Sequence, residues 1–307
     1  MRQQLTQLTF TAAALTGATA LILGSPSVQA LESKTVAINF AGQVGDAAFA
    51  CGETYRVGTT NVAVTPQDFR FYISQVALVD AAGNEVPLVL RQDGKWQHQD
   101  VTLIDFEDKS GACGNGTAET NSQVIGSVPA GDYAGLKFTL GIPFGLNHID
   151  STLAPSPLNL TSLWWNWNAG YKFARADLMP VMEMSQLKQH GGGSHGGGDA
   201  MGKAQPFNIH LGSVGCQMDR TAAPVACKIP NRVVVMMDDF DPETDVVVAD
   251  LAALLSSTDL TAENQEGTPV GCMSSPSDRD CAGIMETLGL PFNDQPVAAQ
   301  SFFTKMK

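Results

Sequence analysis

The sequence predicts a mainly β fold class, an antiparallel β-sandwich with a few short helices and loops stapled by disulfides. Three observations lead to this prediction. Apolar residues alternate over many short segments, turn residues separate those segments, and the chain holds an even number of cysteines, six. Closely spaced short strands with turns between them are typical of sandwiches. No domain boundary is visible before Gly267, so residues 31–307 are expected to form a single domain.

The elements follow from alternation and turn signals along the chain. Val36, Ile38 and Phe40 alternate with small or polar residues and begin the series. Turns that contain Gly, Asn or Asp separate the next strands into a meander. The best helix candidate is 249–257, where leucines recur at helical spacing. The strands expected are 36–40, 69–78, 86–90, 96–106, 136–140, 171–178, 207–211, 232–237 and 244–248.

The second of these strands changes its parity. Apolar side chains alternate from Phe69 to Ile73, and the alternation then shifts by one position before Val76 and Leu78. One extra residue in a strand turns the later side chains to the other face. The shift therefore predicts a β-bulge between Ile73 and Val76.

The N-terminus has the features of a secretory signal peptide. A cationic start at Arg2 precedes an apolar run over 10–23, and Val28-Gln29-Ala30 offers a cleavage site with small residues. The apolar run is short for a membrane span, and no later stretch is long enough to serve as one. Residues 1–30 are therefore expected to be removed, and the mature chain to be periplasmic or secreted.

The charge balance restricts the partners. The formal net charge is −13. Nucleic acids are bound through Lys and Arg, so this balance argues against a nucleic-acid partner. It favours cations or a basic partner instead.

Six cysteines in an exported chain most simply form three disulfides. Two pairs bracket short loops, and the two remaining cysteines are left for a bond of longer range. The alternative is a zinc site made of four thiolates, but no C-x2-C spacing occurs. The bonds expected are Cys51–Cys113, Cys216–Cys227 and Cys272–Cys281.

The stretch 157–173 holds three of the four tryptophans. In an extended backbone Trp165 and Trp167 share one face, whereas a helix would pair Trp164 with Trp167. Such a cluster suits a packed corner of the core, a stacking platform for a ligand or a redox-active aromatic relay. The sequence leaves these three interpretations open.

A glycine-rich loop at about 179–205 interleaves thioethers and imidazoles. The glycine tract is expected to be flexible, because glycine loses more conformational entropy on ordering than other residues. Met selects Cu(I) and His suits both copper states, so the loop is an auxiliary copper-binding candidate. The alternative is an insertion loop without a ligand role. The candidates are Met179, Met182, Met184, His190, His195 and Met201.

Three histidines lie in segments of more regular pattern. His98 follows Trp96 by two residues, His148 ends a turn-rich passage, and His210 lies in a candidate strand. A lone histidine is usually an ordinary hydrogen-bonded residue, whereas three that converge would form a metal site. The sequence does not show whether they converge.

No enzyme signature appears in the chain. A G-x-S-x-G elbow, an H-E-x-x-H pair and a phosphate-binding loop are all missing. No set of acid, base and nucleophile can be assigned, so the protein is expected not to be an enzyme.

Several motifs, in order, resemble the MbnP-like family, whose members are also called metallo-mystery pair four-Cys proteins. The resemblance covers roughly 33–290. The four-Cys pattern would fall on Cys216, Cys227, Cys272 and Cys281. The motifs are Phe144-Gly145-Leu146-Asn147-His148, the run 155–160, Trp165-Asn166-Trp167-Asn168-Ala169-Gly170-Tyr171-Lys172-Phe173 and the run 207–216.

The resemblance implies an exported copper-binding protein whose partner is a di-haem enzyme similar to bacterial cytochrome c peroxidases. That partner would oxidise a tryptophan to kynurenine, and histidines would bind Cu(I) beside it. Trp96 fits a Trp-x-His spacing known from related copper proteins, whereas Trp165 and Trp167 belong to the family's own motif, so all three are candidates. The family often has Phe at position 164, where this chain has Trp.

On this hypothesis the direct copper ligands would be His98, His148 and His210. The alternative, from another class, is a metal-free structural or adhesive β-sandwich whose tryptophans serve packing.

Overall fold

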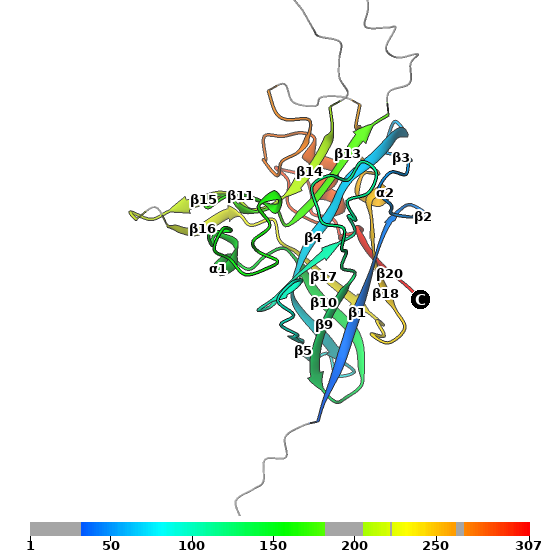
Figure 1. Cartoon of the computed structure of the whole chain (residues 1–307), viewed down its shortest axis with the longest axis vertical. Coiled ribbons are helices and arrows are strands. Elements are labelled where there is room, and N and C mark those ends of the chain that lie inside the picture. The colour runs from blue at the N-terminus through cyan, green and yellow to red at the C-terminus, as the bar shows by residue number, and fades with distance from the viewer. Residues whose placement is uncertain (1–31, 182–204, 222, 262–266) are drawn as a thin grey trace, which may run out of the picture. The chain divides into compact units, whose positions relative to one another are not determined.

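The computed structural model describes residues 32–181, 205–221, 223–261 and 267–307. Within them the chain is mainly β and forms one compact unit, with most strands gathered into two sheets (Figure 1). Most strand pairs are antiparallel, so the predicted fold class is confirmed. The expected signal peptide lies outside the described residues.

One sheet has six strands. Its main path runs β20-β18-β1-β9-β6, and β2 pairs with β1 at the side. The pairing of β1 with β18 is parallel, which the meander did not predict. The strands are β1 (Ser33–Val44), β2 (Ala47–Ala48), β6 (Val89–Leu90), β9 (Gln123–Pro129), β18 (Val246–Asp250) and β20 (Phe303–Met306).

The other sheet has ten strands and is organised around β4 (Val62–Asp80), which is 19 residues long. Its main path runs β17-β10-β4-β13-β14-β19, and β3, β5 and β8 pair with further parts of β4. The other strands are β3 (Tyr55–Val57), β5 (Glu85–Pro87), β7 (Gln97–His98), β8 (Val101–Asp105), β10 (Tyr133–Leu140), β13 (Ala174–Pro180), β14 (Phe207–Leu211), β17 (Val233–Asp238) and β19 (Gly271–Cys272).

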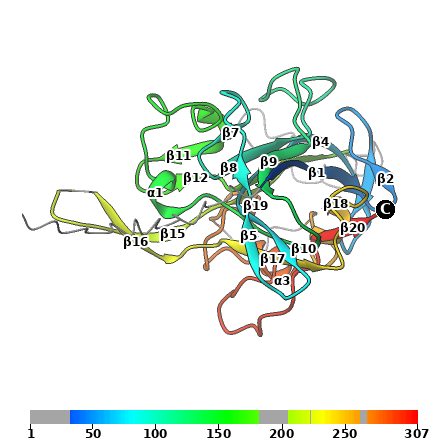
Figure 2. The same cartoon turned by 90° about the horizontal axis from the view of Figure 1, so that it is seen from below.

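Smaller elements complete the described chain. Two hairpins form two-stranded sheets of their own, and Figure 2 shows that one of them, β15–β16, extends away from the larger sheets. The elements are β11 (Trp164–Asn166), β12 (Gly170–Tyr171), β15 (Val214–Met218), β16 (Pro224–Ile229), the helices α1 (Phe144–Asn147), α2 (Leu251–Leu254) and α3 (Cys281–Thr287), and the 3-10 turn η1 (Thr161–Leu163).

An aromatic cluster holds the two sheets together. Phe40 of the six-stranded sheet meets Phe71 and Phe138 of the ten-stranded sheet edge to face, with ring centroids 6.2 and 5.7 Å apart. Phe303 closes the cluster against Phe138 at 5.1 Å. Edge-to-face pairs add to the free energy of apolar burial, so these rings fix how the sheets face each other.

The predicted bulge in β4 is confirmed. Gln75 has a φ of 54°, and the register against β10 shifts between the partners of Ser74 and Ala77. Phe71 therefore faces the core before the bulge, and Leu78 is buried after it.

Four expected elements differ from the structure. The strand expected at 96–106 is a hairpin of β7 and β8, and the strand expected at 171–178 divides between β12 and β13, which lie in different sheets. The helix expected at 249–257 is limited to α2, because the valines before it continue as a strand beside β1 and Asp250 caps the helix at Ala252. The strand expected at 86–90 divides between the two sheets as β5 and β6, because β5 pairs with β4 and β6 pairs with β9.

The three disulfides join the pairs that the spacing predicts, and they leave no free cysteine. They differ in exposure. Cys113 is 2% exposed, and Cys272 and Cys281 are 1% and 0% exposed. In the third disulfide, by contrast, Cys216 and Cys227 are both partly exposed.

Candidate metal centre

A row of ionisable side chains crosses four neighbouring strands of the ten-stranded sheet. Asp105 of β8 lies opposite Arg70 of β4, Arg70 lies opposite Arg175 of β13, and Arg175 lies opposite His210 of β14. Directly opposed residues point to the same face of a sheet. Because Phe71 points into the core, Arg70 and its row lie on the other face.

Two aspartates hold the two guanidinium groups of this row. Asp68 accepts hydrogen bonds from Arg70 Nε and Nη2 at 2.7 and 2.5 Å, and its Oδ2 lies 3.1 Å from Arg175 Nε. Asp177 Oδ2 accepts from Arg175 Nε and Nη2 at 2.7 and 2.5 Å. The side chains of Arg70 and Asp68 are 1% and 0% exposed. Opposite charges thus compensate each other inside the protein, where a lone charge is costly.

His210 extends this network to its last strand. Its Nε2 lies 2.8 Å from Oδ1 of Asp177, so Nε2–H donates and the lone pair remains on Nδ1. Burial lowers the pKa of His210, although the hydrogen bond to Asp177 opposes this effect. Burial would raise the pKa of Asp177, but the hydrogen bond from His210 and the Arg175 charge lower it. The pair is therefore a neutral imidazole held by a carboxylate.

Trp165 lies beside this imidazole. The ring centroids of Trp165 and His210 are 6.5 Å apart. The indole packs over Gly212, where an added Cβ would come within 2.3 Å of its Cζ3. The close approach of Gly212 to the indole therefore requires glycine at this position.

The tryptophan segment covers the ionisable row. The Ser162 carbonyl accepts from Lys172 Nζ at 3.1 Å and from Arg175 Nη1 at 3.0 Å. Burial, reinforced by the Arg175 charge, lowers the pKa of Lys172 to about 8. Nearby, Tyr72 and Tyr171 meet edge to face at 5.9 Å. Cationic groups thus fix the backbone just before Trp165.

His148 occupies a different place. Its Nδ1 lies 3.0 Å from the carbonyl oxygen of Trp167, and its Nε2 lies 3.4 Å from Sγ of Cys227. Trp167 follows β11 in a turn, and its side chain is 47% exposed. An extended backbone would have placed Trp165 and Trp167 on one face. The chain turns at Trp167, so this expectation does not apply to it.

His98 lies on the β7 hairpin. Its Nε2 is 3.3 Å from Nε2 of Gln99, and the neighbouring Trp96 ring packs under Lys95 Nζ at 4.9 Å. Trp96 has no ring contact with an imidazole among the described residues.

The structure therefore brings one predicted imidazole, that of His210, beside one predicted indole, that of Trp165, whereas His148 contacts Trp167 only at the backbone carbonyl. In the described ranges, the groups of three or more His, Cys, Asp or Glu ligand atoms within 4.8 Å are His148 with Cys216 and Cys227, and Glu107 with Cys51 and Cys113. None of these groups combines two histidines. The auxiliary candidate Met179 is half-buried in β13. The candidates Met182, Met184, His190, His195 and Met201 lie outside the described residues.

The sequence did not identify the residues that support His210. Asp177 and Arg175 were expected only as parts of the strand at 171–178, and Arg70 only as part of the strand at 69–78. Asp68 precedes that second strand and was not singled out. The signal available was the placement of ionisable residues inside strands of otherwise apolar pattern, such as Arg70 between Phe69 and Phe71.

Asp105 lies at the β8 end of the row of ionisable side chains, and its pKa leads us to expect a pH effect on the free energy of unfolding. Burial, opposed by the Arg70 charge, raises the pKa of Asp105 from 3.8 to about 7. Between these values the folded protein binds a proton that the unfolded chain releases, so this group contributes less stability as pH rises from about 4 to about 7. Asp105→Asn should remove that loss. The free energy of unfolding of the variant, minus that of the wild type, should increase from pH 5 to pH 8.

Urea unfolding of both proteins at each pH measures this difference. His210 acts in the opposite direction, because its lowered pKa costs stability as pH falls through its ordinary value of 6.5. That effect is common to both proteins and cancels in the difference. A difference that stays constant with pH would show that Asp105 is ionised throughout.

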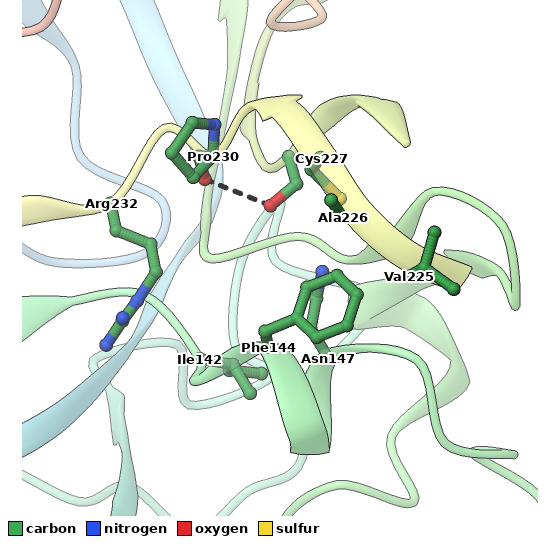
Figure 3. Close-up of a pocket in the computed structure, with 9 residues that line it drawn as sticks. Ile142, Phe144, Asn147, Val225, Ala226, Cys227, Pro230 and Arg232 are labelled. Atoms are coloured by element: carbon green, nitrogen blue, oxygen red, sulfur yellow. Dashed lines mark hydrogen bonds between the residues drawn. The ribbon is translucent and has the colours of Figure 1, made fainter. Parts of the chain in front are cut away.

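A cavity of about 310 Å³ lies near His148 rather than beside His210. Figure 3 shows Phe144 and Asn147 on one side of it and the β16 residues Val225, Ala226 and Cys227 on the other. Its walls are mostly apolar. None of the helices in the described ranges has the length and apolar character needed to span a membrane.

Comparison with known proteins relates these features to one family. The family model described as MbnP matches residues 33–274. The solved structure of MbnP from Methylosinus trichosporium is similar, with a TM-score of 0.73 and 29% sequence identity over 90% of this chain and 99% of that chain. No curated protein matches the chain.

Proposed function

The chain belongs to the MbnP family, and from this we propose that it is an exported copper-binding protein. Cu(I) would be held by His210 and by a kynurenine formed from Trp165. The contact between Trp165 and His210, with Asp177 behind the imidazole, is the observation that carries the proposal. Three disulfides are typical of an exported protein and support a periplasmic or secreted location.

The donor groups at His210 fit a soft monovalent ion. Metal-binding imidazoles usually donate the other ring N–H to a carboxylate, which fixes the tautomer and the direction of the lone pair. Asp177 has this role for His210. The lowered pKa of His210 also keeps the imidazole neutral, as ligation requires. When bound, copper would be present as Cu(I), which accepts a small number of soft or neutral ligands.

Among the candidate tryptophans, the geometry favours Trp165. Trp167 is largely exposed and holds His148 through its backbone, and Trp96 packs against a lysine. Only Trp165 among the described tryptophans has a ring contact with a histidine. Its indole is a poor ligand. Oxidative ring opening would convert it into an aryl amine and a ketone, which offer N and O donors beside the imidazole of His210.

A di-haem partner similar to bacterial cytochrome c peroxidases would supply the oxidation. Electrons would leave Trp165 for the partner's haems, and this chain would be the substrate rather than an enzyme. Trp167 lies two residues away and is exposed at the surface, so it offers a route for those electrons.

His98 and His148 were the other two ligands predicted from the sequence. Their imidazoles contact other groups, so the proposed copper ion is placed at His210 without them. The Met/His/Gly segment remains a predicted auxiliary copper loop. It joins Pro180 of β13 to Phe207 of β14, and those two strands carry Asp177 and His210.

Intact-mass spectrometry and metal analysis of protein purified from its native export compartment test the proposal. We expect bound copper and a mass increase of about 4 Da, from the loss of one carbon and the gain of one oxygen. Peptide mapping should place the increase on Trp165.

Two variants act as matched comparisons. Trp165→Phe should lose both the mass increase and most of the copper, whereas Trp96→Phe should keep both. A mass increase that persists in Trp165→Phe would rule out this residue. Protein without copper or added mass would favour a metal-free structural sandwich.

A further inference from the structure

We propose that Cys216, Cys227 and His148 form a second soft-metal site that opens when the disulfide between the two cysteines is reduced. The reduced site would bind one Cu(I) ion through two thiolates and one imidazole nitrogen. It is separate from the Trp165 and His210 site and needs no oxidised tryptophan.

The three ligand atoms already lie together. Cys216 and Cys227 are directly opposed in the β15–β16 hairpin, and the two sulfurs and a ring nitrogen of His148 all lie within 4.8 Å of one another. Nε2 of His148 is 3.4 Å from Sγ of Cys227. Two thiolates and one imidazole are a ligand set that Cu(I) accepts.

The hydrogen bonds of His148 place its lone pair on Nε2, the ring nitrogen 3.4 Å from Sγ of Cys227. The Trp167 carbonyl can only accept, so Nδ1–H donates to it at 3.0 Å. Nε2 then carries the lone pair and accepts from Nδ2 of Asn147 at 3.2 Å. Asn147 is itself held, since its Oδ1 accepts from the backbone N–H of Tyr171. The imidazole thus shares one feature with metal-binding histidines, because its other nitrogen is bound to a carbonyl, and an ion at Nε2 would replace the Asn147 amide.

Exposure favours selective reduction of this disulfide. Cys216 and Cys227 are both partly exposed, whereas each of the other two disulfides contains at least one cysteine that is 2% exposed or less. Thiol–disulfide exchange requires a thiolate to reach a sulfur, so a dithiol should attack the hairpin first.

The surroundings give the sulfurs room to separate. Cys227 lines the cavity of about 310 Å³, opposite Phe144, as Figure 3 shows. The hairpin is a two-stranded sheet of its own, so its strands can shift without breaking the hydrogen bonds of the larger sheets. The Phe144 ring packs against His148 at 4.8 Å and would shield one side of a bound ion.

The chemistry balances with a dithiol as reductant. The dithiol gives two electrons and two protons to the bond between Cys216 and Cys227, and it becomes a disulfide itself. Two thiols result. Binding of Cu(I) then releases their two protons, and the ion keeps its oxidation state.

Cu(I) titration of the whole mature protein, expressed without a di-haem partner, tests the proposal. One sample is reduced with dithiothreitol, freed of it under anaerobic conditions and compared with the untreated sample against a chromogenic Cu(I) chelator. Alkylation and mass mapping identify which cysteines became free. We expect free Cys216 and Cys227, and one more equivalent of tightly bound Cu(I) than in the untreated protein.

His148→Gln should lower the affinity of this additional site by about tenfold or more, while the disulfide remains reducible. Cys216→Ser should lose the additional equivalent. His98→Ala is the matched control and should leave it unchanged. The proposal would be overturned if another disulfide is reduced first, or if reduction adds no equivalent of bound Cu(I). It would also be overturned if His148→Gln leaves the Cu(I) affinity of the additional site unaltered. Both samples are expressed without the di-haem partner, so their tryptophans are not oxidised. The result is therefore independent of whether Trp165 is oxidised in the native protein.

Discussion

Asp68→Asn should destabilise the fold by about 3–5 kcal/mol, because it leaves two guanidinium groups in the protein interior with too few compensating charges. The Asp68 side chain is 0% exposed and contacts both Arg70 and Arg175. Asparagine has nearly the same shape, so no cavity forms and the effect reports charge. Urea unfolding followed by circular dichroism at pH 7 measures the loss.

Glu85→Gln provides the matched comparison. Glu85 Oε1 lies 2.5 Å from Lys137 Nζ, but the two side chains are 46% and 30% exposed. Water screens such a pair, so its loss should cost less than about 1 kcal/mol. Equal effects of the two substitutions would mean that water reaches the Asp68 pair and that the network does not organise the site.

The sequence predicts a strand best where one face of the strand packs on the core and the other does not, because apolar and other residues then alternate. Val36, Ile38 and Phe40 follow this pattern and lie in β1. The change of parity after Ile73 was sufficient to predict the bulge, because the side-chain period of a strand is two and one extra residue reverses it. Local alternation therefore carries most of the fold class.

The buried ionisable row could not be predicted in the same way. Arg70 alternates with Phe69 and Phe71, which normally indicates a solvent-facing side chain. In the structure the tryptophan segment forms a further layer over that face, and Arg70 reaches Ser162 Oγ at 3.4 Å. The layer comes from residues about 90 positions later, so no local pattern reveals it.

The site depends on registers that a single sequence does not fix. Asp177 lies opposite Asn208, and His210 lies two residues further along β14, so their contact is a diagonal one between paired strands. A shift of one residue would turn His210 to the other face. Both strands were expected, but the long segment between them hid their pairing.

His210→Ala should lower the Cu(I) affinity of the oxidised protein by more than about 100-fold, because it removes a ligand rather than a residue that orients one. Asp177→Asn should cost about 10–100-fold. In the wild type the Asp177 carboxylate accepts a hydrogen bond from Nε2–H of His210. In the variant the asparagine amide can donate to Nε2 instead, and the imidazole proton would then move to Nδ1. Nδ1 is the atom whose lone pair would bind copper, so ligation would be weakened. Competition with a chromogenic Cu(I) chelator measures both losses in protein confirmed to carry the modified tryptophan.

His98→Ala distinguishes this site from one that gathers distant histidines. Its imidazole lies on the β7 hairpin against Gln99, so the affinity should stay within about twofold. Circular dichroism controls for folding, since Asp177 keeps its two bonds to Arg175 in His210→Ala. An affinity that His210→Ala leaves intact would remove this residue from the site. Equal losses in His98→Ala and His210→Ala would instead require the two imidazoles to meet, which needs the β7 hairpin to move toward β14.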